Sequence, residues 1–156
     1  MRRKDREVTD FKRITEIMRD CDCCRLGLAD GNGVYIVPMN FGMIETDGKI
    51  SLYFHSAVCG RKIDILRSQS RVSFEMDTGH RLVADSVSGQ CSFLYQSVIG
   101  SANAVFVEDR AEKILALKLI MEHYGDKSVW DFSDEVLSKT AVIRLDVTEL
   151  SCKAHV

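Results

Sequence analysis

The sequence predicts a mainly β domain, a largely antiparallel barrel with helices at its periphery. Strand-like segments follow one another through tight turns at residues 30–33 and 46–49, the pattern of a meander. Helical spacing appears before the first strand and again between the later strands. The chain has no Gly-x-Gly-x-x-Gly after a strand and no Walker-type Gly-Lys-Ser/Thr. A doubly wound nucleotide-binding sheet is therefore disfavoured.

The length and composition predict one domain covering residues 1–156. Apolar residues make up 46% of the chain and charged residues 28%, as in ordinary soluble globular domains. The 21 Lys and Arg against 23 Asp and Glu give a net charge of −2, which offers no general attraction to nucleic acid or an acidic membrane. The charged N-terminus leads into no apolar signal core, and no apolar run approaches the roughly 20 residues of a membrane span. We therefore expect a cytoplasmic protein.

The first half of the chain is expected to hold two helices and three strands. Phe11, Ile14 and Ile17 recur at helical spacing and predict a helix over residues 9–20. Strands are predicted over residues 24–29, 34–44 and 50–55. Pro38 should interrupt the second of these at an edge or bulge, because proline cannot donate a ladder hydrogen bond. Residues 60–68 are predicted to form a short helix.

The second half is expected to hold the long strands and the clearest helix. Strands are predicted over residues 71–76, 91–107 and 140–150, and helices over 109–124 and 131–138. Gly100 predicts a bulge or bend in the long strand, and Gly125 predicts the end of a helix. The polar segment 77–88 is ambiguous, with a strand near residues 81–84 as one reading.

The segment from His55 to Lys62 is the most informative for chemistry. A strand ends near His55 and Ser56, and a helix begins near Gly60 with the cations Arg61 and Lys62 in its first turn. Cations are unfavourable at a helix N-terminus, which already carries partial positive charge. A bound anion, most naturally a phosphate, would resolve that conflict. The alternative is a solvated basic turn.

Two further segments have polar groups that a ligand could use. Val37, Met39 and Asn40 lie on a strand whose backbone could bind the edge of a planar ring; otherwise Met39 belongs to the core and Asn40 faces water. In the segment Tyr95-Gln96-Ser97-Val98-Ile99-Gly100, the polar Tyr95, Gln96 and Ser97 could hydrogen-bond a ligand, or the segment could be an ordinary strand. The sequence alone leaves both pairs of alternatives open.

Metal and nucleophile motifs are weak in this chain. Cys21 and Cys24 form a single Cys-x-x-Cys pair, and the four histidines show no ligand spacing, so we expect free thiols and no metal site. Ser56 has no Gly-x-Ser-x-Gly frame, so no serine hydrolase is predicted. No catalytic residue can be named.

Several segments, in order along the chain, together suggest a family: Arg2-Arg3-Lys4-Asp5-Arg6-Glu7-Val8-Thr9-Asp10, Cys24-Arg25-Leu26-Gly27-Leu28, Val37-Pro38-Met39-Asn40-Phe41-Gly42, Phe54-His55-Ser56-Ala57, Gly60-Arg61-Lys62 and Tyr95-x-Ser97-Val98-x-Gly100. They resemble the flavin-binding split-barrel proteins related to pyridoxamine 5′-phosphate oxidase, in particular the branch of 5-nitroimidazole resistance proteins. The resemblance implies a six-stranded antiparallel split β-barrel with flanking helices. It also implies a homodimer with FMN at the subunit interface.

The resemblance assigns roles to residues position by position. Arg61 and Lys62, beside Gly60, would hold the FMN phosphate, and His55 and Ser56 would line the phosphate or ribityl end. The isoalloxazine edge would lie along Val37, Met39 and Asn40. The partner subunit would contribute Tyr95, Ser97 and Val98.

The function implied by the resemblance is FMN-dependent reduction of a small-molecule substrate, such as the nitro group of a nitroimidazole. One alternative is a flavin-binding or flavin-storage protein without dedicated turnover. Another is a split-barrel protein that binds haem or a deazaflavin, with His55 as the only axial ligand near the pocket. The C-terminal signature that binds pyridoxal phosphate in the true oxidases is absent, so vitamin synthesis is disfavoured. Residues 77–88 look specific to this chain and could border the substrate pocket.

Overall fold

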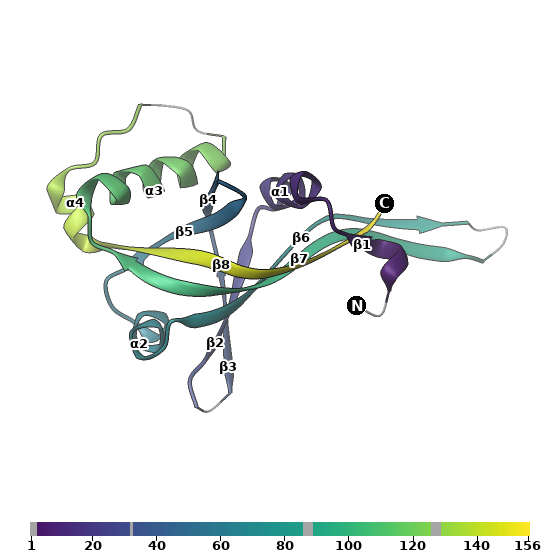
Figure 1. Cartoon of the computed structure of the whole chain (residues 1–156), viewed down its shortest axis with the longest axis horizontal. Coiled ribbons are helices and arrows are strands. Elements are labelled where there is room, and N and C mark those ends of the chain that lie inside the picture. Colours follow the sequence, from purple (N-terminus) through teal and green to yellow (C-terminus); the bar gives the residue numbers. More distant parts are fainter. Residues whose placement is uncertain (1–2, 32, 86–88, 126–128) are drawn as a thin grey trace.

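The computed structural model describes residues 3–31, 33–85, 89–125 and 129–156. Within them the chain forms eight strands, four α-helices and one 3-10 turn (Figure 1). In chain order the elements are η1 (Lys4–Arg6), β1 (Glu7–Val8), α1 (Phe11–Asp20), β2 (Cys24–Ala29), β3 (Val34–Met39), β4 (Gly42–Thr46), β5 (Lys49–Ala57), α2 (Arg61–Ser68), β6 (Arg71–Ala84), β7 (Cys91–Val107), α3 (Arg110–His123), α4 (Asp134–Lys139) and β8 (Thr140–His155).

All strands belong to one antiparallel sheet in the order β3-β2-β6-β7-β8-β5-β4, with β1 paired to β8. The two ends of this path, β3 and β4, are consecutive in the chain. Only Asn40 and Phe41 separate them, so Met39 and Gly42 lie within about 11 Å of each other. The sheet therefore curls until its two edges meet at this corner, which makes it an open, split barrel.

The inside of the barrel holds the main apolar core. Alternate residues of the strands point inward, among them the fully buried Phe54 and Phe74, and Phe41 from the link between β3 and β4 is also fully buried. Helices α1 and α2 contribute Ile17 and Ile63 to the same core. Helix α3 packs outside, against β4 and β5, over a smaller cluster (Figure 1). The predicted mainly β architecture with flanking helices is confirmed.

The strand count rises from the expected six to eight for two reasons. The short β1 pairs with the end of β8, and the expected strand 34–44 divides into β3 and β4. The division falls at Asn40 and Phe41 and not at Pro38, which lies inside β3 opposite Arg25. Because β3 ends the sheet path, Pro38 needs no second ladder partner, and its predicted edge position is confirmed.

The helix boundaries follow their caps. The side chains of Asp10 and Asp109 accept hydrogen bonds from backbone N–H groups of α1 and α3, at 2.7 Å and 2.8 Å. Ser133 accepts the equivalent bond from Val136, so α4 starts at residue 134 and not at the expected 131. β8 continues to His155, beyond the predicted residue 150, because its final residues pair with β7 and β1.

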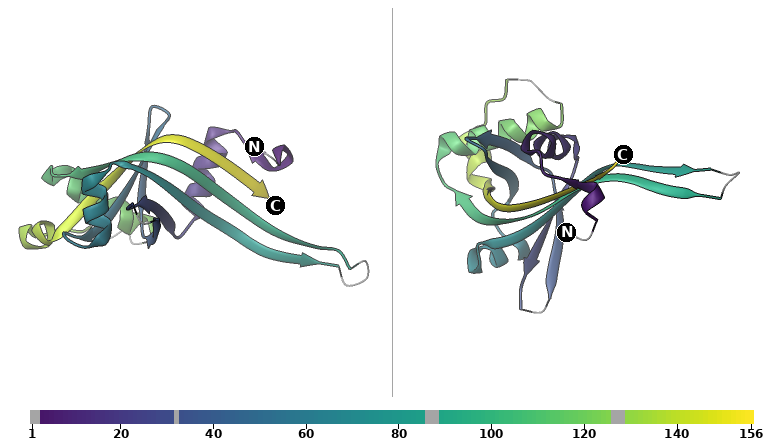
Figure 2. Two further views of the ribbon diagram at one scale, coloured as in Figure 1. Left: turned by 90° about the horizontal axis from the view of Figure 1, so that it is seen from below. Right: turned by 45° about the vertical axis from the view of Figure 1, so that its right-hand side comes forward.

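Strands β6 and β7 extend beyond the barrel as a two-stranded arm (Figures 1 and 2). Residues 77–84 of the segment left ambiguous from sequence continue β6, and the register with β7 shifts between Thr78 and Arg81. Residues 86–88 lie outside the described residues. The arm carries exposed Leu82 and Phe93, which face each other across the two strands. The projecting ribbon thus presents a pair of apolar side chains on its surface.

Gly42 is the position where α3 comes closest to the sheet. A Cβ built there would lie 2.6 Å from the backbone N of Ile120 and 2.7 Å from the carbonyl carbon of Leu119. We expect Gly42→Ala to lower the free energy of unfolding by about 1–3 kcal/mol, because α3 must shift outward. Gly27→Ala is the matched control, since its Cβ would meet only ordinary contacts at 3.7 Å or more. Urea unfolding of the two variants measures the difference, and equal stabilities would contradict the close approach.

Candidate functional site

The start of α2 has the geometry of an anion site. The helix begins at Arg61 after Gly60, whose φ of 122° is accessible to glycine and strained for other residues. The Gly60 carbonyl accepts hydrogen bonds from the N–H groups of Ile63 and Asp64 at 2.9 Å and 3.1 Å, while no side chain caps the helix at Gly60. The first N–H groups of a helix have no acceptor within it, and they attract negative charge.

Arg61 and Lys62 bring two cations to this helix start, as the sequence predicted. The Arg61 side chain is exposed and the Lys62 side chain is partly buried. The guanidinium of Arg61 donates from both Nε and Nη2 to Oδ2 of Asp30, in the turn between β2 and β3, and the Nε distance is 3.2 Å. It also lies over the ring of Tyr35 on β3, with Cζ 4.4 Å from the ring centroid. Sequence reasoning missed both partners, since Asp30 was visible only as part of a turn.

His55 and Ser56 lie at the end of β5, but their side chains point to opposite faces of the sheet. His55 pairs with Val142 of β8 on the outer face, whereas Ser56 pairs with Ala141 and is nearly buried on the inner face. A ligand bound on one face of the sheet at this strand end can therefore contact only one of these two side chains.

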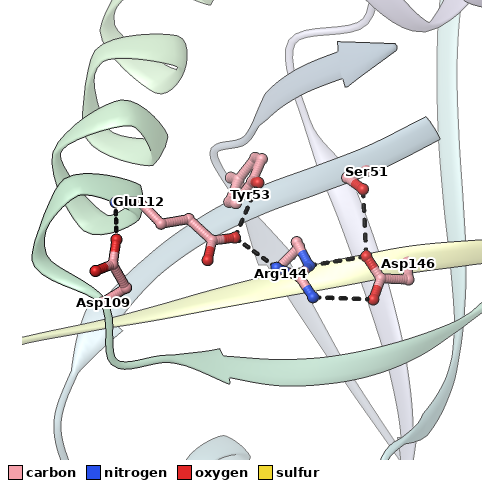
Figure 3. A network of polar contacts seen from close by, with 6 residues as sticks. All are labelled: Ser51, Tyr53, Asp109, Glu112, Arg144 and Asp146. Carbon is pink, nitrogen blue, oxygen red and sulfur yellow. Dashed lines mark hydrogen bonds and ion pairs between the residues drawn. The ribbon is translucent and has the colours of Figure 1, made fainter. Parts of the chain in front are cut away.

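The outer face beside His55 is held by a polar network around Arg144 (Figure 3). Arg144 on β8 donates to Glu112 of α3 and at 2.8 Å to Asp146, and Tyr53 of β5 donates to Glu112 at 3.1 Å. The hydrogen bonds to Asp146 and Glu112 raise the pKa of Arg144, and burial raises the pKa of Tyr53. The network joins α3 to β5 and β8, so helix α3 supports the strand that carries His55.

The end of β3 carries the residues expected along the isoalloxazine edge. Met39 is buried in the core and Val37 is partly buried, while Asn40 is exposed in the link to β4. This is the second of the two alternatives predicted from the sequence, in which Met39 belongs to the core and Asn40 faces water. Phe41 follows in the core, and its backbone N–H donates to the Tyr124 hydroxyl at 3.4 Å.

Tyr95, Ser97 and Val98 lie on β7, at the root of the arm. The Tyr95 ring is near His155, at 6.3 Å between centroids, at the end of β8 that leads to the C-terminus. That end of the chain lies away from α2 (Figure 1). Val98 is fully buried in the core, so only Tyr95 and Ser97 present side chains on the opposite, outer face of the strand. One chain thus does not bring these residues to Arg61.

The outer face of β3, β2, β6 and β7 is a continuous surface with exposed apolar side chains. Val34 and Ile36 on β3 are 68% and 63% exposed, and Ile99 on β7 is 55% exposed. They line a groove of about 320 Å³ together with Gly27, Ser73 and Phe74. Alternation along β7 places Tyr95 and Ser97 on the same face as Ile99.

The charged groups on this outer face are paired with one another. Arg25 donates to Glu75 at 3.1 Å and to Asp77 at 2.6 Å, and Asp77 also contacts His80 at 3.0 Å. The hydrogen bond to Asp77 is the largest cause of the raised pKa of Arg25. This face therefore combines exposed apolar side chains with a cluster of charged side chains that contact one another.

The cysteines are free thiols, as predicted. Cys21 and Cys24 are buried, and burial raises the pKa of Cys21 to about 12 and that of Cys24 well above its usual range. Because the thiolate is the reactive form, this pair is unsuited to redox exchange near neutral pH. In the described parts of the chain, no group of three or more His, Cys, Asp or Glu residues is arranged to hold a metal ion. None of the described helices combines the length and apolar character needed to cross a membrane.

Comparison with known proteins identifies the family. The family profile described as pyridoxamine 5′-phosphate oxidase matches residues 10–154. The chain belongs to this family. A comparison with curated proteins gives no match. The predicted resemblance to the split-barrel relatives of pyridoxamine 5′-phosphate oxidase is therefore confirmed.

Several solved structures share the fold. A candidate 5-nitroimidazole antibiotic resistance protein from Bacteroides thetaiotaomicron is 34% identical, with a TM-score of 0.83, over 94% of this chain and 85% of its own. A flavocytochrome from Azotobacter vinelandii is 19% identical, with a TM-score of 0.80, over 100% of this chain and 72% of its own. An FAD and haem binding protein from Mycobacterium smegmatis is 16% identical, with a TM-score of 0.81, over 96% and 73%. The last two similarities concern the fold alone.

Proposed function

We propose that this family member binds FMN at the interface of a homodimer and reduces nitro groups of small molecules. The observation that carries the proposal is the start of α2, where a helix N-terminus without a side-chain cap coincides with Arg61 and Lys62. The 34% identity to the candidate 5-nitroimidazole antibiotic resistance protein supports the choice of substrate class. FMN as the flavin is favoured by this site, because its phosphate could accept hydrogen bonds from the first N–H groups of α2 and from Arg61 and Lys62.

The roles proposed for the chain's residues are binding, orientation and shielding. The Arg61 and Lys62 side chains and the first N–H groups of α2 would hold the phosphate. The exposed Asn40 and the edge backbone of β3 would face the ring. A bound flavin supplies the electron transfer, so no side chain is required as a catalytic acid or base.

The homodimer is proposed from the exposed outer face of the sheet. Val34, Ile36 and Ile99 on the barrel would be covered by a second copy, and Leu82 and Phe93 on the arm would extend the contact. Tyr95 and Ser97 lie on the same face as Ile99. A partner seated on this face could therefore bring them to the flavin of the other subunit, which one chain does not do.

Turnover distinguishes a reductase from a flavin-storage protein. FMN-loaded protein would be incubated without oxygen with NADH or NADPH and a 5-nitroimidazole, and the products separated by mass. We expect the amine, formed by addition of six electrons and six protons with loss of two water molecules. Intact nitroimidazole after many equivalents of donor, with FMN still bound, would instead identify a storage protein.

A further inference from the structure

We propose that Asp30 and Tyr35 position the Arg61 guanidinium for the FMN phosphate, an inference that rests on the function proposed above. Neither residue lies in α2, and neither was expected at the site from sequence. Both come from the β2–β3 hairpin, and they contact the same side chain from two directions. Together they fix the edge and the plane of the guanidinium, the two properties that planar recognition of a phosphate requires.

Asp30 occupies one edge of the guanidinium and leaves the other available. Nε and Nη2 both donate to Oδ2 of Asp30, and within the described part of the chain Nη1 makes no hydrogen bond. An arginine can pair with an anion through two N–H groups on its Nη1–Nη2 edge. The Asp30 side chain is only 14% exposed, whereas that of Arg61 is 59% exposed. The carboxylate is therefore held within the protein, and the guanidinium is accessible to a ligand.

Tyr35 fixes the plane of the guanidinium. Cζ of Arg61 lies 4.4 Å from the ring centroid, the range in which a planar cation stacks on an aromatic face. The ring itself is partly buried and packs against the barrel core. A lysine at residue 61 would keep the charge but lose both the stacked plane and the two-donor edge.

The hairpin that carries these residues is tied to α2. At the far end of the helix, the side-chain amide of Gln69 donates to the carbonyl oxygen of Ala29, so α2 is attached to the hairpin at both ends. Within the turn, the Asp30 N–H donates to the Gly33 carbonyl at 3.2 Å. The geometry of Arg61 is therefore imposed by a connected frame and does not depend on a ligand being present.

If only charge is considered, Asp30 is expected to weaken FMN binding and not to support it. A carboxylate near a phosphate repels it, so Asp30 as a mere competitor would weaken FMN binding. The two accounts differ in sign for Asp30→Ala, which removes both the charge and the acceptor. They can be separated further by Asp30→Asn, which keeps an oxygen acceptor and removes the charge.

The test measures dissociation constants for FMN and riboflavin in the full-length protein. We expect Asp30→Ala to weaken FMN on the order of threefold to tenfold, and Tyr35→Leu about twofold to fivefold, with riboflavin unchanged for both. Asp30→Asn and Tyr35→Phe should retain wild-type FMN binding or, for Asp30→Asn, improve it. Unchanged riboflavin binding shows in the same experiment that each variant is folded.

An Arg61→Ala background separates positioning from general damage to the hairpin. There, Asp30→Ala and Tyr35→Leu should no longer change the ratio of FMN to riboflavin affinity, because the side chain that they position is gone. Tighter FMN binding by Asp30→Ala would overturn the inference and identify a competitor. A wild-type protein that binds FMN no better than riboflavin would overturn the proposed phosphate site itself, a different result from failure of these variants alone.

Discussion

Replacing Arg61 and Lys62 together with alanine is expected to weaken FMN binding on the order of a hundredfold and to leave riboflavin binding unchanged. Only FMN carries the phosphate, and the two cations in the first turn of α2 are the charged groups proposed to hold it. Each charge-assisted hydrogen bond contributes roughly 1.5–3 kcal/mol to binding. The exposure of Arg61 to solvent reduces the contribution of its hydrogen bonds. Titration followed by flavin fluorescence measures both ligands under identical conditions.

The matched control for this variant is Arg67→Ala in the same helix. Arg67 is also an exposed arginine of α2, but it lies in the last turn, over the ring of Phe106. Its loss should change neither affinity by more than about twofold, because helix-terminal charge effects fade within one turn. Rising salt should weaken FMN binding by the wild type more than by the double variant. An equal loss of FMN and riboflavin affinity would contradict the phosphate site.

Placing lysines at Ile36 and Ile99 is expected to weaken dimer formation by about a hundredfold or more and to weaken FMN binding with it. Both side chains are exposed in one chain and border the groove on the outer face of the sheet. Burying two unpaired ammonium groups in an interface costs several kcal/mol. Sedimentation velocity over a range of protein concentrations measures the change in assembly.

Val136→Lys serves as the control for this pair, since Val136 is also exposed but lies on α4. It should leave both assembly and FMN binding unchanged. A double variant that still dimerises like the wild type would show that the interface lies elsewhere. A monomeric variant that binds FMN at full affinity would show that the site is complete within one chain.

Most of the fold could be predicted because it follows from local patterns. Helix α1 has its apolar stripe and its Asp10 cap, and the β4–β5 turn is marked by Asp47 and Gly48, both with positive φ. The division between β3 and β4 could not be read in this way. Residues 34–44 are almost continuously apolar. The break falls where Phe41 is buried in the core and Gly42 lies against α3, which are tertiary contacts.

The candidate site was predicted less completely than the fold. Arg61 and Lys62 were identified because cations at a helix start conflict with the helix dipole. Asp30 and Tyr35 carried no comparable signal, since the contact joins residues 31 positions apart that only the hairpin brings together. The arm shows the same limit: Leu82 and Phe93 are ordinary strand residues in the sequence, and only the projecting ribbon makes them an exposed pair.

The most direct test of the proposed flavin site combines gel filtration with the absorbance of the eluted protein after saturation with FMN. We expect one FMN for each chain, eluting with a dimer, and a flavin spectrum that survives passage through the column. Protein that elutes without flavin absorbance after incubation with excess FMN would contradict the site at α2, whatever its assembly state.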